Sequence, residues 1–410
     1  TPSVVSGNVS ITASASAFAS SHVNQYINAQ PQGRARILDF VSSSEVKVVT
    51  EYPFFDTSTI AANTWELEEG YEDVWSSSRG YPKSAVFHEG RLYFGGTKSR
   101  PSTVFGSKVG LFFDFKATEL LDDDAVQATL DTNQFNSIVD MVSGRDLQIF
   151  SSGGEFFIPQ TSTNPITPLT MIFKNVSRHG SRGGTKAIPL ESGTVFVQRG
   201  GKSLNEFLFS DAQLTYITNK ISLLAGHLLK APKRMALRRA TSTDEGDLLL
   251  INNDQDGTMA VFSIMRSQNV VAPSEYTTNG NFLDVQADVQ DIYCATERTF
   301  DGTNHYFVEK FEDTLFTDCA FTGTSASSVS SLPHTATTVN VITDGIPQDD
   351  ETVSGGSVTF GRSAESTFEV GLAFTPVVKT MPVDFRLNTG VRTTFKKRIL
   401  QVNAIVNDTQ

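Results

Sequence analysis

The sequence predicts a mainly β, multi-domain protein in which a central β-propeller-like repeat of four-stranded sheets is flanked by small β-barrel or sandwich domains, with one short helix. Three observations lead to this fold class. The 30 phenylalanines and the frequent serine, threonine, valine and glycine residues favour sheet over helix. Short apolar segments alternate with glycine turns along the chain. The 410 residues exceed one small core, and we expect domains at residues 1–75, 76–320 and 321–410.

Residues 1–75 predict the first small β-barrel or sandwich. Residues 18–27 have room for one or two helical turns, residues 30–33 (QPQG) form a turn, and the acidic residues 66–73 are interpreted as a linker. Strands are expected at residues 9–13, 35–40 and 46–50, and residues 65–67 are expected to close the domain.

Residues 79–115 contain the pattern around which the chain is organised. Strands are expected at residues 85–88 and 91–96 on either side of a Glu89-Gly90 turn, and further strands at 104–105 and 111–113. The same order of strand, turn and strand recurs in four later blocks, at residues 138–158, 187–209, 235–277 and 282–311.

The recurrence predicts a β-propeller. Blocks spaced by roughly 40 to 50 residues are typical of that fold, because one four-stranded sheet cannot cover both of its apolar faces without neighbours. The spacing is irregular and no Trp-Asp or kelch signature repeats, so a β-sandwich or jelly roll is the alternative.

One helix is expected at residues 219–230, where Ile221, Leu224 and Leu228 fall close to one face and Pro232 blocks continuation. After residue 321 the composition shifts to serine and threonine, which suggests a domain boundary. Strands of the last domain are expected at residues 338–343, 357–360, 365–370, 375–383 and 396–406.

Charge and cysteine content exclude several classes of protein. The net charge of −12 provides no general basic field for nucleic acid. Cys294 and Cys319 are expected to be two buried thiols, with a disulfide between them left open. No apolar run is long enough for a transmembrane helix, and no signal peptide opens the chain.

A search for catalytic, metal-binding or cofactor-binding residues yields no site, so we expect no enzyme activity, no metal and no cofactor. The histidines lack metal-ligand spacing; they are His22, His88, His179, His227, His305 and His334. The acidic run 122–124 and the segment 252–257 lack the pattern of a calcium loop and are interpreted as a solvated loop and a tight turn. Glu155, Glu191 and Glu206 are candidates for a glycosidase pair, although glutamates occur in any sheet.

Several motifs, in order, resemble the tail tubular protein B, or nozzle protein, family of short-tailed bacteriophages. The resemblance covers most of the chain, from about residue 65 to 383, and departs from the family where Pro273 rather than tryptophan follows VVA. The matching segments are 79–82 (RGYP), 87–88 (FH), 91–92 (RL), 95–97 (GGT), Pro101, 105–107 (FGS), 113–115 (FDF), 179–180 (HG), 195–200 (VFVQRG), 223–228 (LLAGHL), 256–260 (DGTMA), 268–272 (QNVVA), 306–311 (YFVEKF) and 353–356 (VSGG).

The resemblance implies a structural virion protein of the phage tail, made in the host cytoplasm. Such a protein would form a homohexameric ring below the portal and adapter, with tail fibres or spikes at its side. It would continue the DNA channel, retaining the genome and then releasing it, without sequence-specific binding to the double-stranded DNA. An acidic wall would repel phosphates during passage. The alternative is a receptor-binding or glycan-degrading tail protein.

Overall fold

The computed structural model describes residues 1–68, 75–116, 121–161, 165–190, 193–243, 245–379, 386–387, 390–391 and 398–403. The described chain is nearly all β, and its helices are single 3-10 turns: η1 (Ser20–His22), η2 (Gly226–Leu228) and η3 (Arg266–Gln268). In the part of the chain that is described, no helix has the length and apolar character needed to cross a membrane. The chain divides into unit 1, residues 1–82 with 97–100, and unit 2, residues 83–96 with 101–410.

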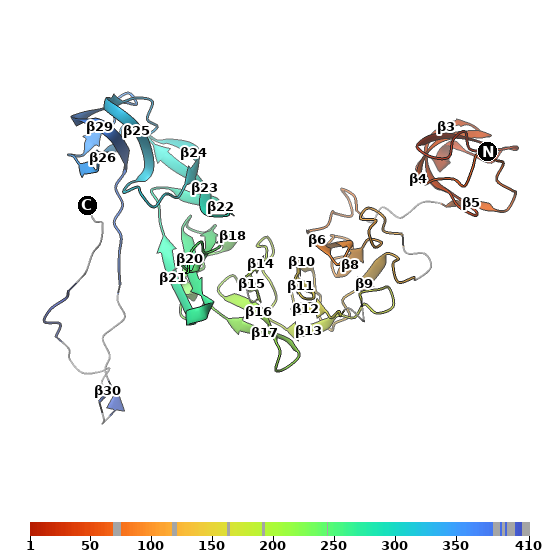
Figure 1. The fold of residues 1–410 in the computed structure, drawn as a ribbon, viewed down its shortest axis with the longest axis horizontal. Helices are drawn as coiled ribbons and strands as arrows, with labels where there is room; N and C mark the ends of the chain where they lie inside the picture. Colours follow the sequence, from red (N-terminus) through yellow and green to blue (C-terminus); the bar gives the residue numbers. More distant parts are fainter. Residues whose placement is uncertain are drawn as a thin grey trace. The chain divides into compact units, whose positions relative to one another are not determined.

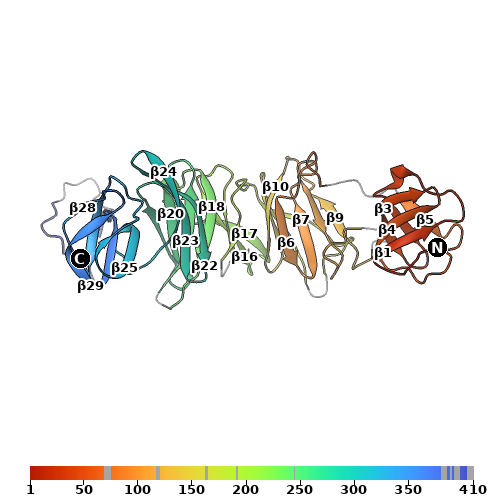
Figure 2. The same ribbon diagram turned by 90° about the horizontal axis from the view of Figure 1, so that it is seen from above.

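Unit 1 contains one five-stranded antiparallel sheet in the order β1-β4-β3-β2-β5. Figure 2 labels β1, β3, β4 and β5 of this sheet. Its strands are β1 (Asn8–Thr12), β2 (Tyr26–Ala29), β3 (Arg34–Ser42), β4 (Glu45–Tyr52) and β5 (Trp65–Glu68). The inward positions of β3 and β4 supply Ile37, Val46 and Val48 to one core with Phe18. The three strands predicted at residues 9–13, 35–40 and 46–50 are confirmed, and residues 65–67 lie in β5. Residues 18–27 contain only η1 before β2 begins. The predicted linker falls largely on residues 69–74, outside the described residues.

Unit 2 contains a succession of antiparallel sheets, as Figure 1 shows. The first four have four strands each and the fifth has three. They are β6 (Ser84–His88), β7 (Arg91–Gly95), β8 (Thr103–Gly106) and β9 (Val126–Thr129); β10 (Ile138–Ser143), β11 (Leu147–Ser151), β12 (Glu155–Ile158) and β13 (Lys174–Ser177); β14 (Ile188–Pro189), β15 (Gly193–Val197), β16 (Leu204–Ser210) and β17 (Thr215–Lys220); β18 (Pro232–Arg238), β19 (Asp247–Asn253), β20 (Met259–Met265) and β21 (Val270–Tyr276); and β22 (Asn281–Asp288), β23 (Asp291–Phe300) and β24 (Thr303–Lys310).

The middle sheets bury both faces, which is the packing of propeller blades. In β19, Leu249 and Ile251 enter a core shared with the preceding sheet, while Leu250 enters a core shared with the following one. In β11, Ile149 packs toward the first sheet and Phe150 toward the third. Since successive side chains of a strand point to opposite faces, an unbroken apolar run such as residues 248–251 is what a doubly covered strand requires.

A last sheet follows in unit 2, with the order β25-β29-β26-β27 and β28 paired to β26. The serine- and threonine-rich stretch lies inside β25 and pairs with β29. The bounds are β25 (Asp318–Val329), β26 (Thr338–Thr343), β27 (Ile346–Pro347), β28 (Glu351–Thr352) and β29 (Val358–Leu372), and a short hairpin of β30 (Arg386–Leu387) and β31 (Gly390–Val391) comes later in the chain.

Three predicted elements are wrong. The fourth strand of the first sheet is β9 rather than residues 111–113, of which Leu111 makes only an isolated bridge to Lys108 and the next two lie in a turn. Residues 219–220 belong to strand β17 and pair with β16, so the predicted helix shrinks to η2; an isolated helix of about 12 residues has little stability of its own. Residues 375–379 are not a strand, and part of the two terminal predicted strands lies outside the described residues.

The two-residue turns are confirmed. Glu89 and Gly90 both have positive φ, 44° and 75°, which is the geometry of a tight hairpin whose twist matches its strands. The pairs Asp301-Gly302 and Asp344-Gly345 repeat it.

Candidate functional site

Two of the three glutamates considered for a glycosidase pair, Glu155 and Glu206, have separate partners within the fold. Glu155 is fully buried, and its carboxylate accepts hydrogen bonds from Ser177 Oγ and, at 3.0 Å, from Ser181 Oγ. Burial raises the pKa of Glu155, against the effect of these hydrogen bonds. Glu206 is also buried and forms an ion pair with Arg266. Glu191 lies outside the described residues.

The described histidines have different hydrogen-bond partners, although His305 and His334 both pack on the ring of Phe300. His22 Nδ1 accepts a hydrogen bond from Ala19 N, His88 Nδ1 lies 2.9 Å from Ser143 Oγ, and His305 stacks on Phe307. His179 and His227 are both exposed. Among the described residues, no three histidine, cysteine or acidic side chains are grouped as metal ligands.

The acidic run 122–124 is held through its backbone. The buried guanidinium of Arg91 donates to the carbonyl oxygens of Asp122 at 2.7 Å and Asp124 at 2.5 Å, and to Ser107 O at 2.7 Å. The segment 252–257 ends in a turn, as predicted, in which Thr258 Oγ1 donates to Asp256 Oδ1 at 2.8 Å. Both features are therefore parts of the chain's own hydrogen bonding.

Two cavities of about 490 and 620 Å³ lie in unit 1, on either side of residues 59–61. The smaller is lined by Phe54, Phe55 and one carboxylate, Asp56. The larger is lined mainly by small side chains with Phe18 and Trp65. Neither lining brings together a pair of ionisable side chains of the kind that general acid–base catalysis uses.

Buried polar side chains instead join successive sheets of unit 2. Asp140 in β10 accepts hydrogen bonds from Ser84 Oγ in β6 at 2.8 Å and from Ala187 N, just before β14, at 2.9 Å. Asn252 in β19 donates to Leu283 O in β22 at 2.8 Å. Each of these side chains connects its own sheet to a neighbouring one.

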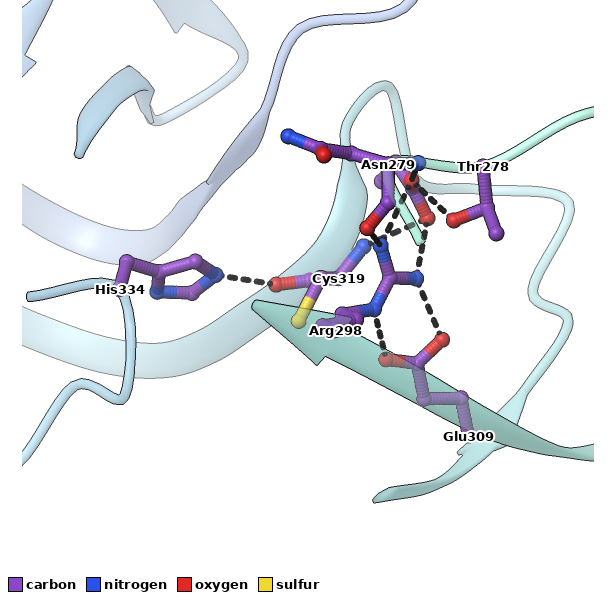
Figure 3. A network of polar contacts seen from close by, with 7 residues as sticks. Thr278, Asn279, Arg298, Glu309, Cys319 and His334 are labelled. Atoms are coloured by element: carbon purple, nitrogen blue, oxygen red, sulfur yellow. Dashed lines mark hydrogen bonds and ion pairs between the residues drawn. The ribbon is translucent and has the colours of Figure 1, made fainter. Parts of the chain in front are cut away.

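We call such a buried polar contact between two sheets or strands a joint. The largest joint surrounds Arg298 of β23 (Figure 3). Its guanidinium binds Glu309 of β24 through Nε at 2.7 Å and Nη2 at 2.6 Å. It binds Asp318, the first residue of β25, through Nη2 at 2.8 Å and Nη1 at 3.0 Å. A fifth bond runs from Nη1 to Asn279 O at 3.2 Å. A guanidinium has five N–H donors, so none remains to bind a substrate.

The second carboxylate of the joint is equally engaged. Asp318 also accepts hydrogen bonds from Thr278 Oγ1 at 2.6 Å and from Asn279 N at 3.3 Å. Burial would raise the pKa of Asp318, but the bonds from Arg298 and Thr278 outweigh it and hold the pKa below its ordinary value. Burial likewise opposes the charge of Arg298, and the bonds to Glu309 and Asp318 outweigh it and raise the pKa of that guanidinium. The joint thus locks the β23–β24 hairpin to the start of β25.

Cys319 and His334 complete this region, also shown in Figure 3. Both cysteines are buried free thiols, as expected, and burial raises the pKa of each to about 12, so they are poor nucleophiles. His334 Nε2 lies 3.1 Å from Cys319 O. Because a carbonyl only accepts, Nε2 carries the proton, and the buried Nδ1 has no hydrogen-bond partner among the described residues.

We expect this histidine to destabilise the fold in mild acid. Burial lowers the pKa of His334 in the folded chain. Below about pH 6.5 this histidine therefore binds a proton in the unfolded chain while it stays neutral in the folded chain. Stability therefore falls as pH falls through the window between about 6.5 and the lowered pKa. Urea unfolding at about pH 7.5 and about pH 5.5 should show a smaller loss in His334→Leu than in the unchanged chain. An equal loss in both proteins would contradict the prediction.

The charged residues of these joints were not singled out by the sequence analysis. Arg298 follows Ile292, Cys294 and Thr296 at alternate positions of β23, all of them buried. A charged residue that continues an inward-facing series predicts a buried ion pair, and this signal could have identified Arg298.

Comparisons with known proteins give no family. No family model matches the chain, and no curated protein matches it. Among solved structures, the β-propeller domain of Nup133 from Vanderwaltozyma polyspora is 9% identical with a TM-score of 0.34, over 90% of this chain and 99% of that one. Hsv2p from Kluyveromyces lactis is 10% identical with a TM-score of 0.33, over 71% and 72% of the two chains. An exo-β-1,3-galactanase from Phanerochaete chrysosporium is 10% identical with a TM-score of 0.30, over 71% and 92%. At these levels the likeness has no bearing on function.

Proposed function

We propose that this chain is a structural subunit of a short-tailed phage tail, a nozzle protein that assembles as a ring of six and continues the DNA channel below the portal and adapter. The proposal is supported mainly by the use that unit 2 makes of its buried polar groups. Asp140, Asn252 and Arg298 each bond to a neighbouring sheet or segment of the same chain. A wall that must withstand a packed genome needs such cross-connections between sheets, and the motif order described above points to the same family.

The charge of the chain supports the passage of DNA through such a ring. With a net charge of −12, six copies would carry about −72, and the wall would repel phosphates and release no counterions to favour binding. We therefore expect double-stranded DNA to bind the purified protein no more tightly than about 10⁻⁴ M at physiological salt, the weak end of non-specific binding.

Electron microscopy of the purified chain in negative stain tests the proposal. The expected particle is a six-fold ring with a central opening, and the mass measured by light scattering should be six times that of the chain. A stable monomer at high concentration, or a three-fold spike, would contradict it.

The same preparation tests the glycan-degrading alternative. Host surface polysaccharide is incubated with the protein, and released oligosaccharide is measured beside Glu155→Gln and Glu206→Gln. We expect no release. Repeated release that either substitution abolishes would establish an enzyme and overturn the proposal.

A further inference from the structure

An exposed apolar surface lies at strand β6 and in the segment that follows strand β8. We name it the loop patch: Phe87, Val109, Leu111, Phe112 and Phe113. Phe113 is 91% exposed, and the rings of Phe87 and Phe112 meet edge to face at 5.1 Å. Large exposed aromatic side chains gathered in one place mark an interaction surface.

The loop that carries the patch is held firmly in place. Besides the bonds from Arg91 to carbonyls at both ends of the loop, Val109 N donates to Asp123 O at 3.0 Å and Gly110 N to Gly90 O at 2.9 Å. Lys108 forms an ion pair with the buried Asp124 at 3.1 Å. Residues 108–114, which carry Phe112 and Phe113, are therefore held by several backbone hydrogen bonds, and docking onto this segment costs little conformational entropy.

The rim of the loop patch is acidic. Glu89 lies in the turn beside Gly110, and Asp122 and Asp123 lie beside Val109. All three side chains are exposed, and none forms an ion pair within the described part of the chain. The surface is thus an apolar centre with exposed acidic side chains at its edge, which favours an apolar partner that carries a positive charge.

The chain itself contains a segment of that chemistry. Residues 373–379 (AFTPVVK), which we name the arm, follow β29 and lie outside every strand. Phe374, Val377 and Val378 are exposed, Val378 to 90%, and Lys379 follows them directly. In the described residues the arm's backbone makes no hydrogen bond. Extended apolar segments of this kind are stabilised when they lie on a complementary surface.

We propose that the arm of one copy lies on the loop patch of a second copy, with Val377 and Val378 against Phe113 and Lys379 near Asp122 and Asp123. This inference rests on the proposed self-assembly and adds the contact that drives it. An arm and a patch are different surfaces, so the contact is heterologous, and successive copies joined in this way close into a ring if the rotation allows.

Crosslinking between differently tagged copies tests the contact directly. One copy carries Phe113→Cys and the other Val378→Cys, both at exposed positions, and a short bismaleimide joins thiols that lie close together. Cys294 and Cys319 are buried and provide little background. We expect a crosslinked pair containing both tags. Leu223→Cys, exposed in another segment, replaces Phe113→Cys as the matched control and should give none.

Charge reversal tests the recognition. Lys379→Glu should weaken self-association about tenfold or more, as loss of a charge pair does at an interface. Asp122→Lys with Asp123→Lys, added to Lys379→Glu, should restore most of the affinity. The hydrogen bonds that Asp122 and Asp123 make to the loop use their carbonyl oxygens, so the substitutions leave these backbone bonds in place.

The outcomes separate this inference from the proposed function. A six-fold ring without the mixed crosslink would overturn the arm contact and leave the nozzle proposal intact. A mixed crosslink in particles that are not rings would support the contact and contradict the nozzle. A crosslink confined to single chains that carry both cysteines would mean that the arm covers its own patch, and would overturn the inference.

Discussion

Replacing Arg298 by leucine is expected to destabilise unit 2 by about 3–5 kcal/mol, the effect of removing one partner from a buried ion pair. The side chain of Arg298 is fully buried, and its loss leaves Glu309 and Asp318 facing each other without a cation. It also leaves Asn279 O without its donor. The free energy of unfolding, measured in urea by far-ultraviolet circular dichroism, gives the effect.

Two controls make this measurement specific. Arg362→Leu removes a half-exposed partner of Asp344 and should cost less than about 1 kcal/mol. Trp65 and Trp75 both lie in unit 1, so tryptophan fluorescence should follow an unfolding transition that Arg298→Leu leaves unchanged. If the two arginine substitutions have equal effects, the joint is not a structural lock.

Phe207→Ala is expected to cost about 3–5 kcal/mol, the usual range for an aromatic side chain removed from a well-packed core. Phe207 is completely buried between the second and third sheets. Its ring stacks on Tyr216 at 4.6 Å and meets Phe150 edge to face at 5.6 Å. Alanine would leave a cavity that the flanking strands cannot close without losing their pairing.

Two further substitutions show whether the loss of stability in Phe207→Ala comes from the core. Phe207→Leu keeps most of the volume and should cost clearly less than alanine. Phe135→Ala, at an exposed position, should change the free energy of unfolding by less than about 0.5 kcal/mol. A loss for Phe207→Ala as small as that for Phe135→Ala would mean that the two sheets do not share a core.

The joint around Arg298 also shows why the roles of buried charged residues could be predicted only in part from the sequence. The sequence offers Glu155 and Glu206 as candidates for a glycosidase pair, whereas in the folded chain they bind Ser181 and Arg266. It did not consider Arg298, although the alternating burial of β23 marks that position as inward. The type of a residue shows which hydrogen bonds and ion pairs it can form, but the partners that form them lie in distant segments of the chain.

Local patterns in the sequence were sufficient for the fold class, most strands and the hairpin turns. The run at residues 248–251 has the apolar character of a strand buried on both faces, and Glu89-Gly90 has the residues of a tight turn; both depend on contacts between near neighbours. Only the tertiary structure decided that β9 completes the first sheet, that residues 219–220 extend β17, and that Arg298 joins three strands. Periodicity describes one segment at a time, whereas strand partners and buried ion pairs are selected by the free energy of packing residues that are far apart in the chain.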